Sequence, residues 1–533
     1  MAHSPAAGFD RLIAALRDPR CYPHPVDRVE VLQTHISAVL LTGSLAYKIK
    51  KPVNLGFLDF SSLAARRFYC EEELRLNRRT APELYLRVVP ITGSEDAPAI
   101  GGSGSPIEYA LVMRQFQQQA LFDAMARRGA LSRTHMADLA HAVAKFHAAA
   151  ARAEPLGSFG SPEKVLSLAL ENFDQIRALA ADGSTRLEQL RAWTCEEHAR
   201  RVAMFTSRTR EGFVRECHGD LHLRNIALID GVPTPFDCIE FSDELRWIDV
   251  MSELAFLVMD LFAHRLPGLA FAFLDAYLEH AGDYQGLALL RFYAVYRALV
   301  RAKVACIRAH QPGVLAEERA QSDKRYLDHL SLAGDLASRD RPALIIMHGL
   351  SGSGKSTAAA ELVALLGAIR CRSDVERKRL HGISAGARSG SALAAGIYSS
   401  AANRQTYDRL AGFARDVLDA GYPVIVDAAF LSRNERDCFR ALAQDCGAPF
   451  AIASCSAPLP LLRERVMRRE GQGRDASEAG LAVLERQLEV QEPLDSHESA
   501  CVFSIDTSGP EALPRDAATS LASRLKLGSL YQV

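Results

Sequence analysis

Short runs of branched or aromatic residues, separated by turn-forming residues, fill the first hundred positions and predict strands joined by turns. Residues 29–41 are rich in β-formers, Thr-Gly-Ser at 42–44 suits a hairpin turn, and residues 45–50 would return as a strand. Residues 62–79 have helical spacing and begin with serines suited to capping. A Gly-, Ser- and Pro-rich loop precedes another strand at 107–116. The chain therefore begins with a β-rich layer that carries one helix.

Beyond these strands the spacing of apolar residues becomes helical, except for one irregular segment at 217–241. Residues 289–308 form a long, strongly apolar helix candidate, which we expect to be buried. Polar residues and a closing proline indicate a linker at 331–342. We therefore place a first domain at 1–335 and a second at 336–533.

After the linker, strand-like and helical segments alternate, which predicts a parallel sheet wrapped by helices. The expected strands lie near residues 343–347, 368–371, 423–427, 450–455 and 501–505.

The most specific motif is Gly-Leu-Ser-Gly-Ser-Gly-Lys-Ser at 349–356, which follows the first of these strands and opens an Ala-rich helix. Such a phosphate-binding loop (P-loop) turns backbone N–H groups inward around a β-phosphate, at the positive end of a helix. Lys355 would reach the β- and γ-phosphates, and Ser356 would ligate Mg²⁺. The expected nucleotide contacts are Gly349, Ser351, Gly352, Ser353, Gly354, Lys355, Ser356 and Thr357.

Two aspartates and a group of arginines accompany the P-loop. Asp427 ends an apolar strand, where it would hold Mg²⁺ through water; a helix cap or turn is the alternative role. Asp374 would accept the proton of an acceptor hydroxyl, or would cap a helix at 375–380. The arginines of residues 462–474, Arg468 among them, would form a lid over the transferring phosphoryl group, or a solvated charged face.

A second set of polar residues belongs to the irregular segment. His-Gly-Asp at 218–220 is followed by Asn225 and then by Asp237 on an apolar stretch. Kinase-type phosphoryl transfer needs a carboxylate at the acceptor hydroxyl and two groups on metal. Asp220 would be the first of these, with Asn225 and Asp237 as metal ligands, in the expected order and spacing.

A lysine far upstream completes this set. Lys48 ends an Ala-Tyr-Lys motif on a predicted strand and would bind the α- and β-phosphates. It would pair with Glu72 or Glu73 on the helix, and Glu73 is the residue that we select. Lys50 and Lys51 are rivals for this role, and exposed strand-end charges are the alternative for all three lysines.

These motifs carry resemblances to known families. Residues 25–320 resemble the aminoglycoside phosphotransferase and choline kinase branch of the kinase-like fold, through 218–220, Asp-Cys-Ile-Glu at 237–240 and Trp-Ile-Asp-Val at 247–250. Residues 343–525 resemble P-loop small-molecule kinases, the group that includes gluconate kinase, zeta-type toxins and polynucleotide 5′-kinases. The tandem resembles a bacterial family of fusion proteins.

The resemblances imply an α+β, bilobal kinase-like N-terminal domain and an α/β P-loop NTPase C-terminal domain with a parallel sheet. They also imply ATP and Mg²⁺ as cofactors. They do not imply an aminoglycoside substrate, because fold resemblance alone does not carry substrate identity.

Amino-acid composition excludes few classes of binding partner. The 63 basic and 64 acidic residues give a net charge of -1, which does not indicate a nucleic-acid partner and leaves that question open. No apolar run approaches the roughly 20 residues needed to span a bilayer, and no secretory signal is evident. The 11 scattered cysteines lack metal-binding spacing, so we expect reduced thiols and a cytoplasmic protein without a membrane partner.

The predicted function is bifunctional ATP-dependent phosphotransfer. Each domain would move the γ-phosphate of ATP to a hydroxyl of an unidentified, small-molecule acceptor. In the alternative, the first domain is a non-catalytic nucleotide or ligand sensor that regulates the P-loop kinase. The intact Asp220, Asn225 and Asp237 argue against a sensor, because a binding module needs no base. A mechanical P-loop ATPase is disfavoured because two alanines, not an acid, follow Asp427.

Overall fold

The computed structural model folds into two compact units that interleave along the sequence. The first unit comprises Met1–Leu131, Lys145–Ser161 and Ser207–Glu253. The second comprises Ser132–Ala144, Pro162–Thr206 and Leu254–Val533. The structure describes residues 5–56, 58–155, 157–180, 185–311, 313–338, 342–385, 387, 396–472, 477–509 and 515–527.

The first unit is built on a six-stranded antiparallel sheet in the order β1-β2-β3-β6-β4-β5. The strands are β1 Glu30–Gln33, β2 Ser37–Leu41, β3 Leu45–Lys50, β4 Tyr85–Gly93, β5 Pro98–Ile100 and β6 Glu108–Arg114. The hairpin turn predicted at 42–44 is confirmed. The β-rich run at 29–41 is divided into two strands, because the Thr34 hydroxyl accepts the Ser37 N–H and closes a turn.

One helix packs on each face of this sheet: α1 Pro5–Ala15, and α2 Leu63–Asn77, which confirms the helix predicted at 62–79. Successive side chains of a strand point to opposite faces. Ala46 of β3 belongs to the hydrophobic cluster on the α2 side. Lys48 and Lys50, at the same parity, therefore also face α2.

The rest of the first unit consists of short elements that enclose the segment predicted to be irregular. They pair as two small antiparallel ribbons, β7 with β10 and β8 with β9. Their bounds are β7 Val214–Glu216, the 3₁₀ helix η3 Leu223–Asn225, β8 Ile226–Ile229, β9 Val232–Pro235 and β10 Trp247–Asp249.

Helices dominate the first part of the second unit. Those that lie wholly or partly in it are α4 Arg133–Ala149, α5 Pro162–Ala180, α6 Thr185–Arg210, α8 Val250–Ala263, α9 Pro267–Ala281, α10 Leu287–Ala309 and α11 Ala316–Ala337. Helix α10 is buried along most of its length, which confirms the prediction for 289–308.

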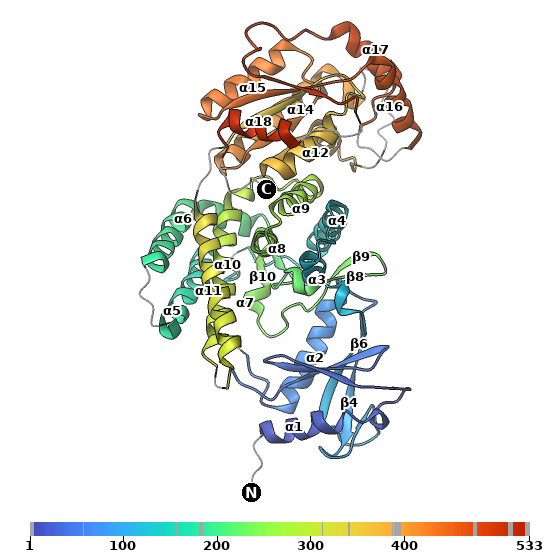
Figure 1. Cartoon of the computed structure of the whole chain (residues 1–533), viewed down its shortest axis with the longest axis vertical. Coiled ribbons are helices and arrows are strands. Elements are labelled where there is room, and N and C mark those ends of the chain that lie inside the picture. Colours follow the sequence, from blue (N-terminus) through green and yellow to red (C-terminus); the bar gives the residue numbers. More distant parts are fainter. Residues whose placement is uncertain are drawn as a thin grey trace. The chain divides into compact units, whose positions relative to one another are not determined.

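The linker predicted at 331–342 is wrong for its first seven residues, because α11 continues to Ala337 and runs beside α10 (Figure 1). The cause is an apolar stripe at helical spacing, which stays buried despite the polar residues around it. Its members are Tyr326, Leu330, Ala333 and Leu336.

The second unit also contains a five-stranded, fully parallel sheet in the order β12-β13-β11-β14-β15. Its strands are β11 Leu344–His348, β12 Ile369–Arg372, β13 Val424–Asp427, β14 Phe450–Ser456 and β15 Val502–Asp506. All five lie where the sequence predicts them. Their carboxyl ends meet at one edge, which is where ligands bind in open α/β sheets.

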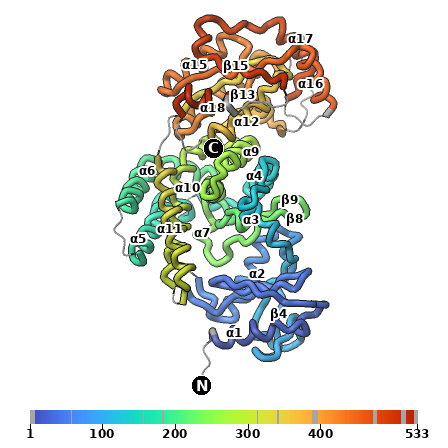
Figure 2. The backbone as a smooth tube through the Cα atoms, viewed as in Figure 1, coloured from blue at the N-terminus to red at the C-terminus, as the bar shows by residue number. Residues whose placement is uncertain are grey.

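Helices surround this sheet, and Figure 2 shows β13 and β15 among α12, α15 and α18. The helices are α12 Lys355–Leu366, α13 Ser373–Leu380, α14 Ser400–Asp419, α15 Arg433–Asp445, α16 Leu459–Gln472, α17 Leu481–Val490 and α18 Arg515–Leu525. Among the described residues, no helix of the protein is both long enough and apolar enough to cross a membrane.

Candidate active sites

The N-terminal site centres on Lys48. Its Nζ donates to Glu73 Oε1 at 2.7 Å and to Asp237 Oδ1 at 2.5 Å. Burial alone would lower the pKa of Lys48, but the carboxylates of Asp237 and Glu73 outweigh it and raise that pKa well above the ordinary value. The strand, the helix and the downstream motif thus meet at one ammonium group.

A second buried lysine, Lys50, joins the same network. Its Nζ donates to Glu73 Oε2 at 2.7 Å and to Glu240 Oε1. Burial would raise the pKa of Glu73, but Lys48 and Lys50 lower it to about 2. Lys50 is thus a partner of Glu73 as Lys48 is, and the sequence motif gave no sign of its contact with Glu240.

The other two residues considered for this role lie elsewhere. Lys51 donates to the Thr34 carbonyl at 2.6 Å, near the surface. Glu72 is paired with Arg75 at 2.9 Å on its own helix.

The loop at 218–225 brings Asp220 and Asn225 together. Asn225 Nδ2 donates to Asp220 Oδ2 and to the Asp220 carbonyl, both at 3.0 Å. Asp237 adopts a positive φ of 65°, and its N–H donates to the Tyr85 hydroxyl at 3.0 Å. That backbone conformation is uncommon outside glycine, and strained residues of this kind cluster at functional sites.

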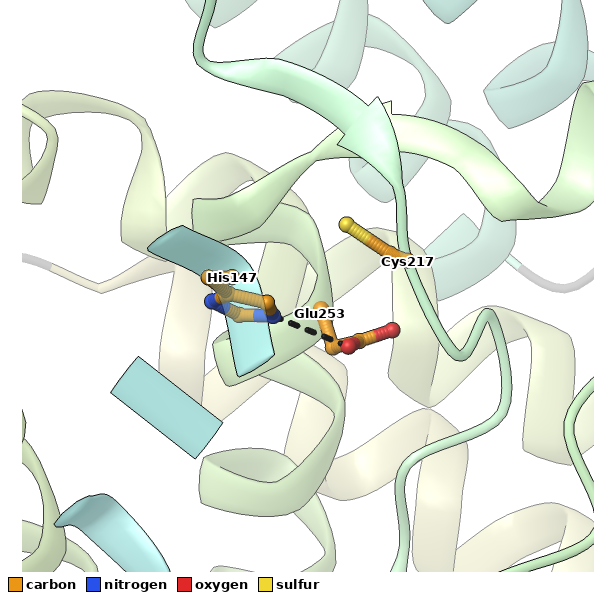
Figure 3. Close-up of side chains that lie close together, drawn as sticks. All are labelled: His147, Cys217 and Glu253. Carbon is orange, nitrogen blue, oxygen red and sulfur yellow. Dashed lines mark hydrogen bonds and ion pairs between the residues drawn. The ribbon is translucent and has the colours of Figure 1, made fainter. Parts of the chain in front are cut away.

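Behind this loop, His147, Cys217 and Glu253 form a buried cluster (Figure 3). Glu253 accepts from His147 Nε2 at 2.9 Å and from the Gly219 N–H at 2.7 Å, and Cys217 Sγ donates to a backbone carbonyl. Burial and the Glu253 carboxylate raise the pKa of Cys217 well above the ordinary value, so it stays a neutral thiol. The three side chains have hydrogen-bond partners within the protein, and Glu253 links the loop, at Gly219, to α4, at His147. Sequence reasoning missed this cluster.

The C-terminal site begins at the predicted P-loop, between β11 and α12. Gly349 has a φ of 136°, and a Cβ there would lie 2.4 Å from the Cys455 carbonyl oxygen, so only glycine fits. Lys355 Nζ donates to the carbonyls of Gly349 and Leu350, both at 2.7 Å. Burial lowers the pKa of Lys355, and the nearby Asp427 carboxylate offsets part of that effect.

A residue of α17 reaches the P-loop as well. Gln487 Oε1 accepts the N–H of Ser351, a residue of the loop, at 2.8 Å. The sequence carried no motif that marks Gln487.

A cavity of about 1110 Å³ opens beside the loop and collects most of the residues predicted for this site. The predicted residues along its wall are Ser351, Gly352, Gly354, Lys355, Ser356, Thr357, Asp374, Asp427 and Arg468. Asp374 lies in the first turn of α13, whose N-cap is Arg372, so Asp374 is not the capping residue. Gly349 and Ser353 belong to the loop itself.

Asp427 is buried at the end of β13, and its Oδ2 has no hydrogen-bond partner among the described residues. A buried, unpartnered carboxylate oxygen is costly unless a cation or water completes it. Ser356, the serine of the loop, lines the same cavity. A hydroxyl and a carboxylate are the hard oxygen ligands that Mg²⁺ prefers, so this donor set fits that ion.

The arginines of α16 divide between two faces. Arg465, Arg468 and Arg469 line the cavity, whereas Arg463 pairs with Glu485 near the surface. Arg465 donates to the Thr507 carbonyl at 2.6 Å. The end of the predicted lid, at 473–474, lies outside the described residues.

Polar groups that sequence reasoning did not single out line another part of the cavity. Arg377 donates to Asn403 Oδ1 at 2.9 Å, and Asn403 donates to Glu435 at 3.3 Å. Burial raises the pKa of Glu435, although hydrogen bonds from Tyr407 and Asn403 act against it. These groups come from different helices, so no single segment indicates them.

Comparisons with known proteins match two separate segments of the chain to different families. The model of the phosphotransferase enzyme family (APH) matches residues 69–293, and that of an AAA domain (AAA_33) matches residues 344–494. Uncharacterized proteins of Mycobacterium bovis and Mycobacterium tuberculosis are 31% identical over 502 residues, which cover 92% of this chain and 96% of theirs.

Solved structures resemble one part of the chain each. A gluconokinase from Sinorhizobium meliloti is 23% identical, covers 35% of this chain and 96% of its own, and has a TM-score of 0.26. The amicoumacin kinase hAmiN, in complex with AMP-PNP, Ca²⁺ and Ami, is 13% identical, covers 61% and 94%, and has a TM-score of 0.38.

Proposed function

This chain belongs to the family of its mycobacterial relatives and joins a phosphotransferase-family region to a P-loop kinase region, and from that premise we propose that it is bifunctional, with an ATP-dependent phosphotransferase centre in each region. Both regions are of kinase type, so the protein is an ATP-dependent kinase. The proposal adds that each centre is catalytic and that each acceptor is a hydroxyl of a small molecule.

The observation that carries the proposal is that each candidate site holds a lysine close to carboxylates. In the N-terminal site Lys48 lies between Glu73 and Asp237. Lys48 would bind the nucleotide phosphates, with Glu73 holding it in place. Asp220 would accept the proton of the acceptor hydroxyl while Asn225 orients its carboxylate.

In the C-terminal site, Lys355 and the loop N–H groups would bind the β- and γ-phosphates. Asp374, on the cavity wall, would accept the proton of a second acceptor hydroxyl, and Arg468 would neutralise charge on the transferring phosphoryl group. Asn225 and Asp237 in one site, and Ser356 and Asp427 in the other, would hold Mg²⁺. When bound, such an ion would supply positive charge that offsets the negative charge of the nucleotide phosphates.

Two single substitutions test whether both centres turn over. Wild type, D220N and K355A are incubated with ATP and a bacterial metabolite extract, and new phosphorylated species are measured by mass spectrometry. D220N should lower one product by about 10²- to 10⁴-fold through loss of the base. K355A should abolish a different product.

The matched controls are D230N, at an exposed aspartate of the same unit, and K324A, at an exposed lysine of α11. Both should leave the products unchanged. If D220N retains every product and K355A loses all of them, the N-terminal region is a sensor and the bifunctional proposal is wrong.

A further inference from the structure

Two acidic residues of α9 reach arginines at the end of β12, within the second compact unit. Asp275 forms a two-point pair with Arg370, at 2.7 Å to NH2 and 3.3 Å to Nε. Glu279 accepts from Arg372 NH1 at 2.8 Å. Helix α9 lies in the segment that matches the phosphotransferase family, whereas β12 lies in the AAA-domain segment.

The same arginines come close to the carboxylate of the P-loop site. Arg370 NH1 lies 3.9 Å, and Arg372 Nε lies 3.8 Å, from Asp427 Oδ2. Arg370 NH1 also donates to the Ser356 carbonyl at 3.3 Å. Register explains the arrangement, because Arg372 pairs directly with Asp427 across β12 and β13, and Arg370 shares its face two residues earlier.

These distances leave Asp427 Oδ2 close to two guanidinium groups but hydrogen-bonded to neither. Arg370 and Arg372 make their shorter ion pairs to Asp275 and Glu279 instead. The charges of the side chains around Asp427 also favour a bound cation. Among these five side chains, three carboxylates against two guanidinium groups give a net charge of -1. Without the acids of α9 the remaining three carry a net charge of +1, which disfavours a cation.

We propose that Asp275 and Glu279 are positioning residues of the P-loop kinase. They hold Arg370 and Arg372 away from Asp427, so that its free oxygen remains open to a divalent cation. The inference rests on the proposed role of Asp427 as the carboxylate that holds Mg²⁺. It gives the phosphotransferase-family segment a second task, which is to complete the metal site of the other kinase.

Other contacts keep α9 in place and allow the acids to be changed singly. The Tyr284 hydroxyl donates to the Arg370 carbonyl at 3.2 Å, and Arg379 donates to the Glu279 carbonyl. Tyr284 lies just beyond the end of α9 and Arg379 lies in α13, so loss of one carboxylate removes a charge without removing either contact.

The test measures Mn²⁺ affinity by electron paramagnetic resonance in the full-length chain with bound ADP. A D237N background removes the other proposed metal site. D275N should weaken Mn²⁺ binding about 10- to 100-fold, the range found when residues around the direct ligands of a metal are changed. E279Q, at a more exposed position, should weaken it less. Affinity for ADP without metal should stay unchanged in both.

Rescue separates positioning from a structural role. In D275N/R370Q the guanidinium that needs restraint is gone, so Mn²⁺ affinity should return toward the background value. A structural role would predict no rescue. The control E361Q removes an ion pair between Arg133 and α12 in the same unit, at 2.6 Å, and should leave metal binding unchanged.

The outcomes also distinguish failure of the positioning role from failure of the proposed metal-binding role of Asp427. If D427N abolishes the Mn²⁺ signal while D275N and E279Q leave it intact, the positioning role is wrong and the proposed site stands. If D427N itself leaves Mn²⁺ binding unchanged, the proposed role of Asp427 fails, and the positioning role fails with it.

Discussion

Lys50 is a fully buried lysine that contacts two carboxylates from different segments, Glu73 and Glu240. Burial raises the pKa of Glu240, Lys50 lowers it and Glu73 raises it again, and the net effect is an increase. Lys50 is therefore the cation that makes the close approach of two buried acids tolerable. Lys48, by contrast, pairs with Glu73 and with Asp237, whose side chain is 40% exposed.

Replacing Lys50 with methionine should destabilise the first unit. K50M leaves two buried carboxylates without their shared partner, and breaking a buried pair in this way costs about 3–5 kcal/mol. The measurement is urea unfolding followed by circular dichroism. K51M is the matched control, because Lys51 makes one hydrogen bond to a backbone carbonyl and should cost at most about 1.5 kcal/mol. Equal effects of the two variants would contradict the buried network.

At the scale of elements, the start of α8 supports the loop at 218–225. Glu253 lies in the first turn of that helix and accepts hydrogen bonds from the loop, at Gly219, and from α4, at His147. Gly219 has a φ of 85°, and a Cβ there would lie 2.8 Å from the Leu245 carbonyl. The loop thus takes a shape that only glycine permits, and one carboxylate holds it there.

This contact predicts acid sensitivity. Burial would raise the pKa of Glu253, but His147, His218 and the Gly219 N–H lower it from 4.5 to about 2. Between these two pH values the unfolded chain binds a proton that the folded chain does not. The contribution of Glu253 to the free energy of unfolding is therefore complete above pH 4.5 and is lost as pH falls toward 2. The shift corresponds to about 3 kcal/mol.

In E253Q this pH-dependent contribution should be absent. Urea unfolding at about pH 5, 4 and 3, followed by the fluorescence of Trp247 in a W193F background, measures the difference. Trp247 suits the purpose because it stacks on Phe159 in the same unit, with ring centroids 5.7 Å apart. E244Q, at an exposed glutamate, is the control. Parallel stability curves for E253Q and wild type would contradict the assignment.

At the scale of the whole molecule, the compact units do not follow the two family segments. Helices from the phosphotransferase-family segment belong to the same unit as the parallel sheet. Aromatic residues join them: Tyr284 lies 4.5 Å from Phe413, and Phe271 lies 6.4 Å from Tyr422, between ring centroids. The boundary predicted between 335 and 336 remains a prediction.

A fragment of residues 336–533 tests that boundary. Without Tyr284 and Phe271 the fragment exposes the apolar surface of Phe413 and Tyr422, and burial of two large apolar side chains is worth about 3–6 kcal/mol. Its melting temperature should then lie about 10 °C below that of the same region in the full chain. Scanning calorimetry on both proteins measures this. A monomeric fragment that melts at the full-chain temperature would support an independent domain and contradict the packing argument.

Most of the secondary structure could be predicted because its causes are local. The strand before 349–356, the capping serine of α2 and the apolar run of α10 each act over a few neighbouring residues. One local signal was misleading: the polar residues at 331–337 suggested a linker. The segment is helical because packing in the folded protein buries its apolar stripe. Candidate residues such as Lys48, Asp220, Lys355 and Asp427 could be found because each lies in a short motif.

The sequence by itself determined the two phosphate-binding motifs, the parallel sheet and the identity of the candidate bases. Only the tertiary structure decided which carboxylate Lys48 contacts, that Lys50 reaches Glu240, and that Asp275 lies against Arg370, 95 residues away. The physical reason is that a motif depends on chain neighbours, whereas an ion pair depends on which helix faces packing brings together. Burial then makes those pairs strong, and burial is a property of the folded molecule alone.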